Sequence, residues 1–362
     1  MLHLVNQACN SSLSLGMSLV ERHAHLDPER KVRRFLLPRE TTIGRPRFLA
    51  GALALGLLAV AAVLYVPLAG AAAVPKCLIV NTSSDTSYPA LQAAVDAATP
   101  GSTLKLKGTC FGTATINTSL TLTGQFNPGF GTPTLDGDNL GSVVSVGAGV
   151  NVTINNLTIT HGIADFGGGI YNDGGTVTLT GSSSVVSNTA YVLGGGIFNV
   201  GALTLNNNSS VTGNTARVGG GIFNNGYNDT VTLNDRSVVK GNTAIDNGGG
   251  IDNFGALTLN GSSSVTANTA PSGVGGGIIN VGTVTLNGSS SVASNTAYVL
   301  GGGIFNVGAL TLNNSSSVTG NTASFGGGIF NAGAVTLNDS SLVTGNSPDN
   351  CAPVNTIPGC IN

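Results

Sequence analysis

Charge and aromatic side chains are scarce in this chain of 362 residues: charged residues make up 8%, aromatic residues 5%, and tryptophan is absent. All three glutamates lie before residue 48, and the one histidine after residue 73 is His161. Over residues 74–362, six basic residues stand against twelve aspartates, a formal charge of −6 (6 − 12). Such a surface has no basic stripe, which excludes nucleic acid as a partner.

The few remaining acid–base groups do not form a catalytic pattern. Most aspartates are dispersed, and the densest clusters are Asp136 with Asp138 and Asp246 with Asp252. Polysaccharide hydrolysis needs paired carboxylates, and calcium-binding β-helix repeats place Gly and Asp at fixed positions in every turn. Neither pattern is present, and His161 is expected to be structural. The chain is therefore predicted to be non-enzymatic, with no cofactor and no metal site.

Glycine, by contrast, is abundant, with 54 residues, and much of it recurs in a repeat. A GGGI segment occurs seven times, at steps of 27, 25, 29, 27, 26 and 25 residues; its isoleucines are Ile170, Ile197, Ile222, Ile251, Ile278, Ile304 and Ile329. Repeats of this length indicate a solenoid, in which each coil is stable only against its neighbours.

Each repeat contains three short apolar segments, represented by GIF at 196–198, LTL at 203–205 and SVT at 210–212. The Leu–Thr–Leu alternation is typical of a strand with one buried face. Asn199, Asn206 and Asn214 follow the three segments, and asparagine favours corners because it tolerates left-handed backbone. The pattern predicts an all-β, single-stranded parallel β-helix with three sides. The asparagines after the first segment, from Asn172 to Asn331, are predicted to stack inward as a ladder.

Both ends of the repeat region carry irregular segments that are predicted to be caps. Residues 74–110 form an N-terminal cap, with a short amphipathic helix over 88–98, begun by Ser87 and followed by a strand over 103–107. Residues 111–346 form the β-helix, regular from about 167, and 347–362 form a C-terminal cap. Cys77, Cys110, Cys351 and Cys360 allow three disulfide pairings. Pairing within each cap, Cys77–Cys110 and Cys351–Cys360, is favoured over the other two and over free thiols.

The first 73 residues differ in composition from the rest. Residues 1–47 are basic and aperiodic and are predicted to be a disordered extension, and residues 48–73 contain no charge. A positive flank, an apolar run and the small residues at 71–73 favour a cleaved signal peptide. The run is also long enough for an uncleaved membrane anchor. Either way the protein is expected to be secreted or displayed at the cell surface, touching a membrane only through 48–73.

The residue after each repeat isoleucine is aromatic in five of seven coils: Tyr171, Phe198, Phe223, Phe305 and Phe330. Strand alternation turns these side chains outward, so they are predicted to stack into two exposed patches. Exposed aromatic rings suit sugar rings or the apolar edge of a protein, and this row is the predicted binding face. The alternative is that the rings only shield the strands beneath them.

The GGGIFN…LTLNN…SSVTGNTA units resemble the repeats of the polymorphic outer membrane protein family, although GGGI replaces that family's GGA[I/L/V] and a regular FxxN is missing. Residues 77–122, with LQAAVDAATPGSTLKL, resemble the N-terminal region of pectin-lyase-like bacterial surface proteins. These resemblances imply a right-handed β-helix at a bacterial surface, often adhesive. We therefore expect an exported adhesin-like rod that binds a surface glycan or another surface protein. The alternatives are a polysaccharide lyase or hydrolase and a purely structural envelope spacer.

Overall fold

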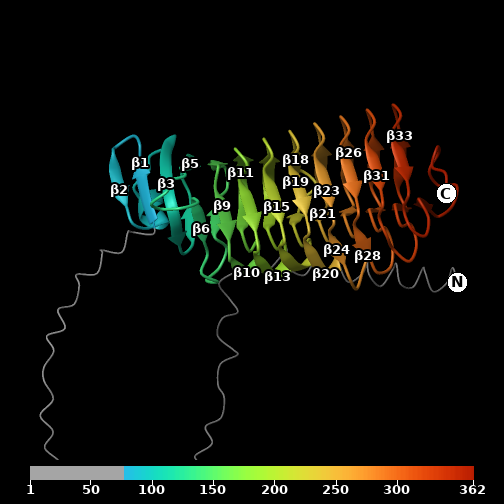
Figure 1. The fold of residues 1–362 in the computed structure, drawn as a ribbon, viewed down its shortest axis with the longest axis horizontal. Helices are drawn as coiled ribbons and strands as arrows, with labels where there is room; N and C mark the ends of the chain where they lie inside the picture. The colour runs from blue at the N-terminus through green and yellow to red at the C-terminus, as the bar shows by residue number, and fades with distance from the viewer. Residues whose placement is uncertain (1–76) are drawn as a thin grey trace, which may run out of the picture. The chain divides into compact units, whose positions relative to one another are not determined.

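The computed structural model describes residues 77–362, in which parallel strands of successive coils lie side by side as a β-solenoid (Figure 1). The predicted parallel β-helix is therefore confirmed. The predicted N-terminal extension (1–47) and the export or membrane segment (48–73) lie outside the described residues. Between residues 77 and 362, no helix has the length and apolar character needed to cross a membrane.

Three rows of strands form the walls of the rod, and each strand pairs with its counterparts one coil away. The first row consists of β4 (Ala114–Ile116), β7 (Val144–Val146), the start of β11 (Ile170–Thr180) and of β14 (Ile197–Leu205), β17 (Ile222–Asn224), β21 (Ile251–Asn253), β25 (Ile278–Asn280), β29 (Ile304–Asn306), β32 (Ile329–Asn331) and β35 (Cys351–Ala352).

The second row consists of β3 (Ser102–Phe111), β5 (Leu120–Gly124), β8 (Asn151–Asn155), the later halves of β11 and β14, β18 (Thr230–Leu233), β22 (Ala256–Leu259), β26 (Thr283–Leu286), β30 (Ala309–Leu312) and β33 (Ala334–Leu337). The third row consists of β6 (Thr134–Asp136), β9 (Thr158–Thr160), β12 (Ser184–Val186), β15 (Ser210–Thr212), β19 (Val238–Lys240), β23 (Ser264–Thr266), β27 (Ser291–Ala293), β31 (Ser317–Thr319) and β34 (Leu342–Thr344). Because β3 already pairs with β5 and β6, the solenoid begins inside the predicted N-terminal cap.

A fourth row of short strands was not predicted. It consists of β10 (Ile163–Phe166), β13 (Thr189–Leu193), β16 (Thr215–Val218), β20 (Thr243–Asn247), β24 (Thr269–Ala270) and β28 (Thr296–Ala297), which form a separate sheet. From β13 onward each strand directly follows the Asn that was predicted to be the third corner, as Thr215 follows Asn214, whereas β10 follows His161-Gly162. The signal is weak because these strands run for only two to five residues and often bear one apolar inward side chain, such as Ala216.

The interior is apolar along the walls and polar at the corners, where buried asparagines and serines recur from coil to coil. Wall residues such as Ile197, Leu203 and Val211 are fully buried. The predicted ladder is confirmed: each Nδ2 donates to the Oδ1 one coil further on, at 2.7–3.0 Å, through Asn172, Asn199, Asn224, Asn253, Asn280, Asn306 and Asn331. These buried amides therefore pair with one another along the rod.

Two further asparagine ladders accompany the predicted one. The second is also buried along most of its length and donates in the same direction, through Asn188, Asn214, Asn242, Asn268, Asn295, Asn321, Asn346 and Asn350. The third is half-buried and donates the opposite way, from Asn338 through Asn313, Asn287, Asn260 and Asn234 to Asn206. The coils are thus joined by three rows of side-chain amides in addition to the backbone.

The N-terminal end is closed by a helix and an antiparallel hairpin. Strand β1 (Cys77–Asn81) pairs antiparallel with β3 and with β2 (Thr86–Tyr88), and helix α2 (Leu91–Asp96) buries Leu91, Ala94 and Val95 against the core. The helix is shorter than predicted because Tyr88 still belongs to β2. Ser87 does not cap it; Ala90 is the N-cap residue and makes no side-chain bond.

Both predicted disulfides are present. Cys77 bonds to Cys110 and Cys351 to Cys360, with Cα–Cα distances of 4.7 and 6.4 Å, so each joins two parts of one cap. At the C-terminal end, β35 pairs with β32, and Ile357 is buried against the core. Asn350 ends the second ladder and donates to the carbonyl of Ile361, which ties the ladder to the cap.

Candidate functional surfaces

The predicted aromatic row forms as stacked rings. Tyr171 stacks on Phe198, and Phe198 on Phe223, with ring centroids 5.4 and 5.7 Å apart and ring planes within 7° of parallel. Phe305 and Phe330 form the second stack, at 5.5 Å. The strand register places all of them at the same position of successive coils. The prediction of two stacks, separated by Asp252 and Ile279, is therefore confirmed.

The prediction that the row is exposed is wrong. Phe198, Phe223, Phe305 and Phe330 are 7%, 1%, 2% and 9% exposed, and Tyr171 is half-buried. Burial, together with the nearby Asp173 carboxylate, raises the pKa of the Tyr171 phenol. The four phenylalanines point away from the main core but are not available as a binding face. Shielding of the strands, the alternative interpretation of the row, fits their burial.

The glycine triplet explains why the rings are covered. The first glycine of the triplet adopts left-handed backbone, as at Gly219 (φ 64°), and a Cβ there would lie 3.0 Å from Cβ of Phe223. A side chain at this position would collide with the ring, and glycine accepts the conformation without strain. The chain therefore folds back over each outward side chain, which forms a second apolar layer beside the main core.

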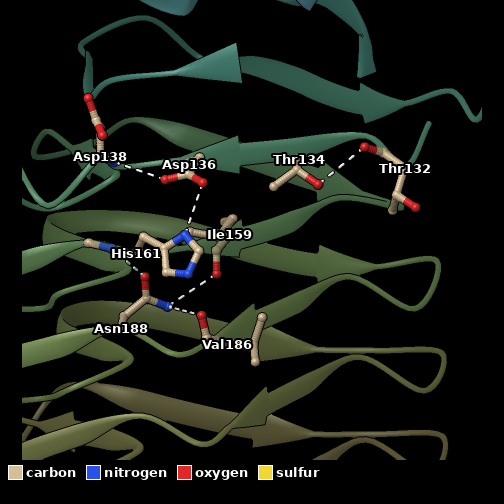
Figure 2. A network of polar contacts seen from close by, with 9 residues as sticks. Thr132, Thr134, Asp136, Asp138, Ile159, His161, Val186 and Asn188 are labelled. Carbon is tan, nitrogen blue, oxygen red and sulfur yellow. Dashed lines mark hydrogen bonds and ion pairs between the residues drawn. The ribbon is translucent and has the colours of Figure 1, made fainter. Parts of the chain in front are cut away.

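A polar pair at one corner of the rod joins residues that are 25 positions apart. Figure 2 shows the ring of His161, which follows β9, facing the carboxylate of Asp136 at the end of β6, with Nδ1 and Oδ2 2.9 Å apart. The other Asp136 oxygen accepts from the backbone N–H of Asp138 at 3.0 Å. The His161 side chain is 56% exposed and that of Asp136 only 15%. The parallel register places these corners one above the other, since Asp136 pairs with Thr160.

This pair can hold the imidazole in one orientation. The backbone N–H of Asp138 donates to Asp136 and helps to fix the carboxylate that faces the ring. Within residues 77–362, no group of three or more His, Cys, Asp or Glu side chains could hold a metal ion. The pair fits the structural role predicted for His161, with Asp136 as the partner that sequence reasoning missed.

The fourth row presents an exposed column that sequence reasoning also missed. It consists of the residue that follows Asn-Thr-Ala in five successive coils: position 191 is Tyr, 217 Arg, 245 Ile, 271 Pro and 298 Tyr. Tyr191 and Tyr298 are 66% and 67% exposed, and Ile245 is 53% exposed. Between the tyrosines, Arg217 forms an ion pair with Asp246. In the sequence, the residue after each Asn-Thr-Ala varies from coil to coil while the residues around it repeat. This variation is the signal that could have identified the column.

Figure 1 shows the labelled strands of the fourth row following one another along one side of the rod. Tyr191 and Tyr298 occupy the same position in the two nearly identical blocks 188–216 and 295–323, four coils apart. At a strand spacing of about 4.8 Å, four coils place them roughly 19 Å from each other. We call this column, from Tyr191 to Tyr298, the tyrosine face.

Comparison with known proteins returned no match: no family model fits the chain, and no curated protein or solved structure is similar to it.

Proposed function

We propose that this protein is an exported, non-enzymatic β-helix rod that binds a surface glycan in an adhesin-like manner through the tyrosine face. The exposure of Tyr191 and Tyr298 is the observation that carries the proposal. Tyrosine combines an apolar ring that stacks on sugars with a hydroxyl that hydrogen-bonds. Two copies of the same ring on one side of a rod suit a polymer with a repeating unit.

Export is proposed from two independent observations. The apolar segment 48–73 follows a basic region, as in secretory signals. The two disulfides are typical of proteins that fold in an oxidising compartment. On this proposal the rod is secreted or displayed at the surface, and its repeats belong with those of polymorphic outer membrane proteins and pectin-lyase-like surface proteins.

The test is a glycan array with the full-length protein and two variants. The double variant Tyr191→Ser/Tyr298→Ser is expected to lose between about fivefold and about 150-fold in apparent affinity, since each stacked ring contributes roughly 0.5–1.5 kcal/mol. Tyr227→Ser is the matched control, because Tyr227 is 80% exposed but lies in the loop before β18. Undiminished binding by the double variant would refute the tyrosine face as the binding surface.

The same purified protein can be used to test two other functions. A polysaccharide lyase or hydrolase would release reducing or unsaturated ends from the bound glycan, and Asp136→Asn would abolish that release. A purely structural spacer would bind no glycan, and removing the protein would instead alter envelope thickness or integrity. We expect neither activity from the protein.

A further inference from the structure

One position of the covered row is occupied by a carboxylic acid. Strand register aligns Asp252 with Phe223 in the coil before and with Ile279 in the coil after. Asp252 is only 4% exposed, similar to the apolar residues that occupy this position in its neighbours. The coil that contains β20, β21 and β22 therefore buries an acid where the adjacent coils bury apolar side chains.

The buried carboxyl lacks a compensating partner. Its Oδ1 is buried without a hydrogen bond, and the chain closes over it at Gly248, where an added Cβ would lie 3.0 Å from Cβ of Asp252. Burial raises the pKa of Asp252 to about 7. A charged carboxylate in such a place costs several kcal/mol unless it is paired, so the group stays protonated in the closed coil.

The same coil has a second polar substitution beside the covered row, at a half-buried position. Asn247 stands in the row where the coils before it place Leu193 and Val218. Its Oδ1 accepts from the backbone N–H of Val274 at 3.2 Å and so is already engaged. One coil thus carries a buried acid in the covered row and a half-buried amide beside it.

Among the described residues 77–362, the groups packed around Asp252 offer no cation to compensate the acid. The strands on either side, β17 and β25, contribute Phe223 and Ile279 and carry no titratable group. On the fourth row, Asp246 of β20 is paired with Arg217 of β16, and both side chains are partly exposed. β24 (Thr269–Ala270) adds no charge. Desolvation alone accounts for the raised pKa of Asp252.

We propose that Asp252 makes this coil a pH-sensitive break in the rod, closed while the carboxyl is protonated and opening locally when it ionises. Opening lets the carboxylate reach water, at the expense of the contacts of β21 with β17 and β25. Because the rod is a stack of coils that contact only their neighbours, a break here divides it into two parts that hold together separately.

The direction of the pH dependence follows from linkage. The closed coil binds the proton up to pH of about 7, whereas an opened, solvated aspartate releases it near pH 3.9. The coil is therefore most stable below pH 4 and loses stability as the pH rises toward 7, after which the dependence levels off. Over this window the equilibrium constant for opening rises about tenfold per pH unit.

Hydrogen–deuterium exchange of the full-length protein at pH 5 and pH 7, corrected for intrinsic exchange, tests the proposal. Between these values the opening constant for amides of β21 is expected to rise about 50-fold, because the closed carboxyl is itself half ionised at pH 7, while that of β14 changes little. Asp252→Asn, which is neutral but isosteric, and Asp252→Leu, which restores an apolar row, are both expected to remove this rise. Asp246→Asn is the matched control, an aspartate of the same coil that is exposed and paired, and should leave it intact.

Two results would overturn the proposal. One is an equal pH response of β21 in the wild-type protein and in Asp252→Asn. The other is a response spread evenly over all coils, which would mean that no local break exists. If Asp252→Leu fails to fold, the comparison with Asp252→Asn still decides the matter.

Discussion

The side-chain amide of Asn253 donates to the amide oxygen of Asn280 at 3.0 Å, although 27 residues separate them in the chain. Asn280 repeats the contact with Asn306 at 2.8 Å, so one residue is donor and acceptor at once. Both side chains are fully buried. Breaking one link therefore leaves unpaired polar groups in two coils, and this makes the ladder sensitive to single substitutions.

Asn280→Leu is expected to lower the free energy of unfolding by about 1–3 kcal/mol, because it leaves the amide groups of Asn253 and Asn306 without their partner. Urea denaturation followed by circular dichroism measures the change. Asn287→Leu, in the half-buried third ladder, is the comparison and should cost less, since water can replace the lost bonds. An equal loss of unfolding free energy in the two variants would contradict the interpretation that burial increases the contribution of the ladder to stability.

Phe223→Ala tests the covered aromatic row. We expect a loss of about 3–5 kcal/mol, as for other large side chains removed from a packed interior, because Phe223 is 1% exposed and stacks on Phe198. Tyr227→Ala, four residues away on the surface, should stay within about 0.5 kcal/mol of the wild-type protein. A thermal transition unchanged in Phe223→Ala would show that the ring is not part of a packed layer.

The middle glycine of the triplet is predicted to be replaceable by no other residue. A Cβ at Gly302 would lie 2.4 Å from the carbonyl oxygen of Thr322, so Gly302→Ala must push neighbouring coils apart. Gly320→Ala is the control: it has left-handed backbone but no heavy atom closer than 3.7 Å, and the equivalent Ala267 already adopts φ 54°. Melting temperatures should fall far more for Gly302→Ala, and the reverse order would refute this account.

The two disulfides are expected to contribute unequally to the free energy of unfolding. The chain between Cys77 and Cys110 spans 33 positions and that between Cys351 and Cys360 only nine. Loop-closure entropy then predicts losses of about 4 and about 3 kcal/mol for the two double Cys→Ser variants. Peptide mapping of the non-reduced protein should find these two bridges and none between the caps. A larger loss at the C-terminal bridge would mean that its effect lies in the folded state.

Much of the fold could be predicted because the strands of the three walls repeat their chemistry in every coil. Leu203-Thr204-Leu205 alternates as a half-buried strand should, and β14 includes it. The fourth row escaped notice because Thr215–Val218 has one fully buried side chain, Ala216, and no alternating pattern. Local sequence indicates which way a side chain points but does not reveal what covers it.

The aromatic row illustrates this limit. Period-two alternation placed Phe198 outside the main core, and the ring does point away from it. Its burial depends on Gly194, four residues earlier, whose left-handed backbone brings the preceding chain over the ring. The contact between Asp136 and His161 could not be predicted from local sequence either, because the two residues are 25 positions apart and only the register of the coils brings them together.

The polarity of the asparagine ladders has a consequence for how such a rod changes length. Each complete coil contributes one donor and one acceptor to each ladder, so a copied coil fits between its neighbours without creating an orphan amide. Exchanges in whole coils, such as the four-coil offset between the two matching blocks, therefore preserve the pairing in all three ladders, including the third, which donates the opposite way.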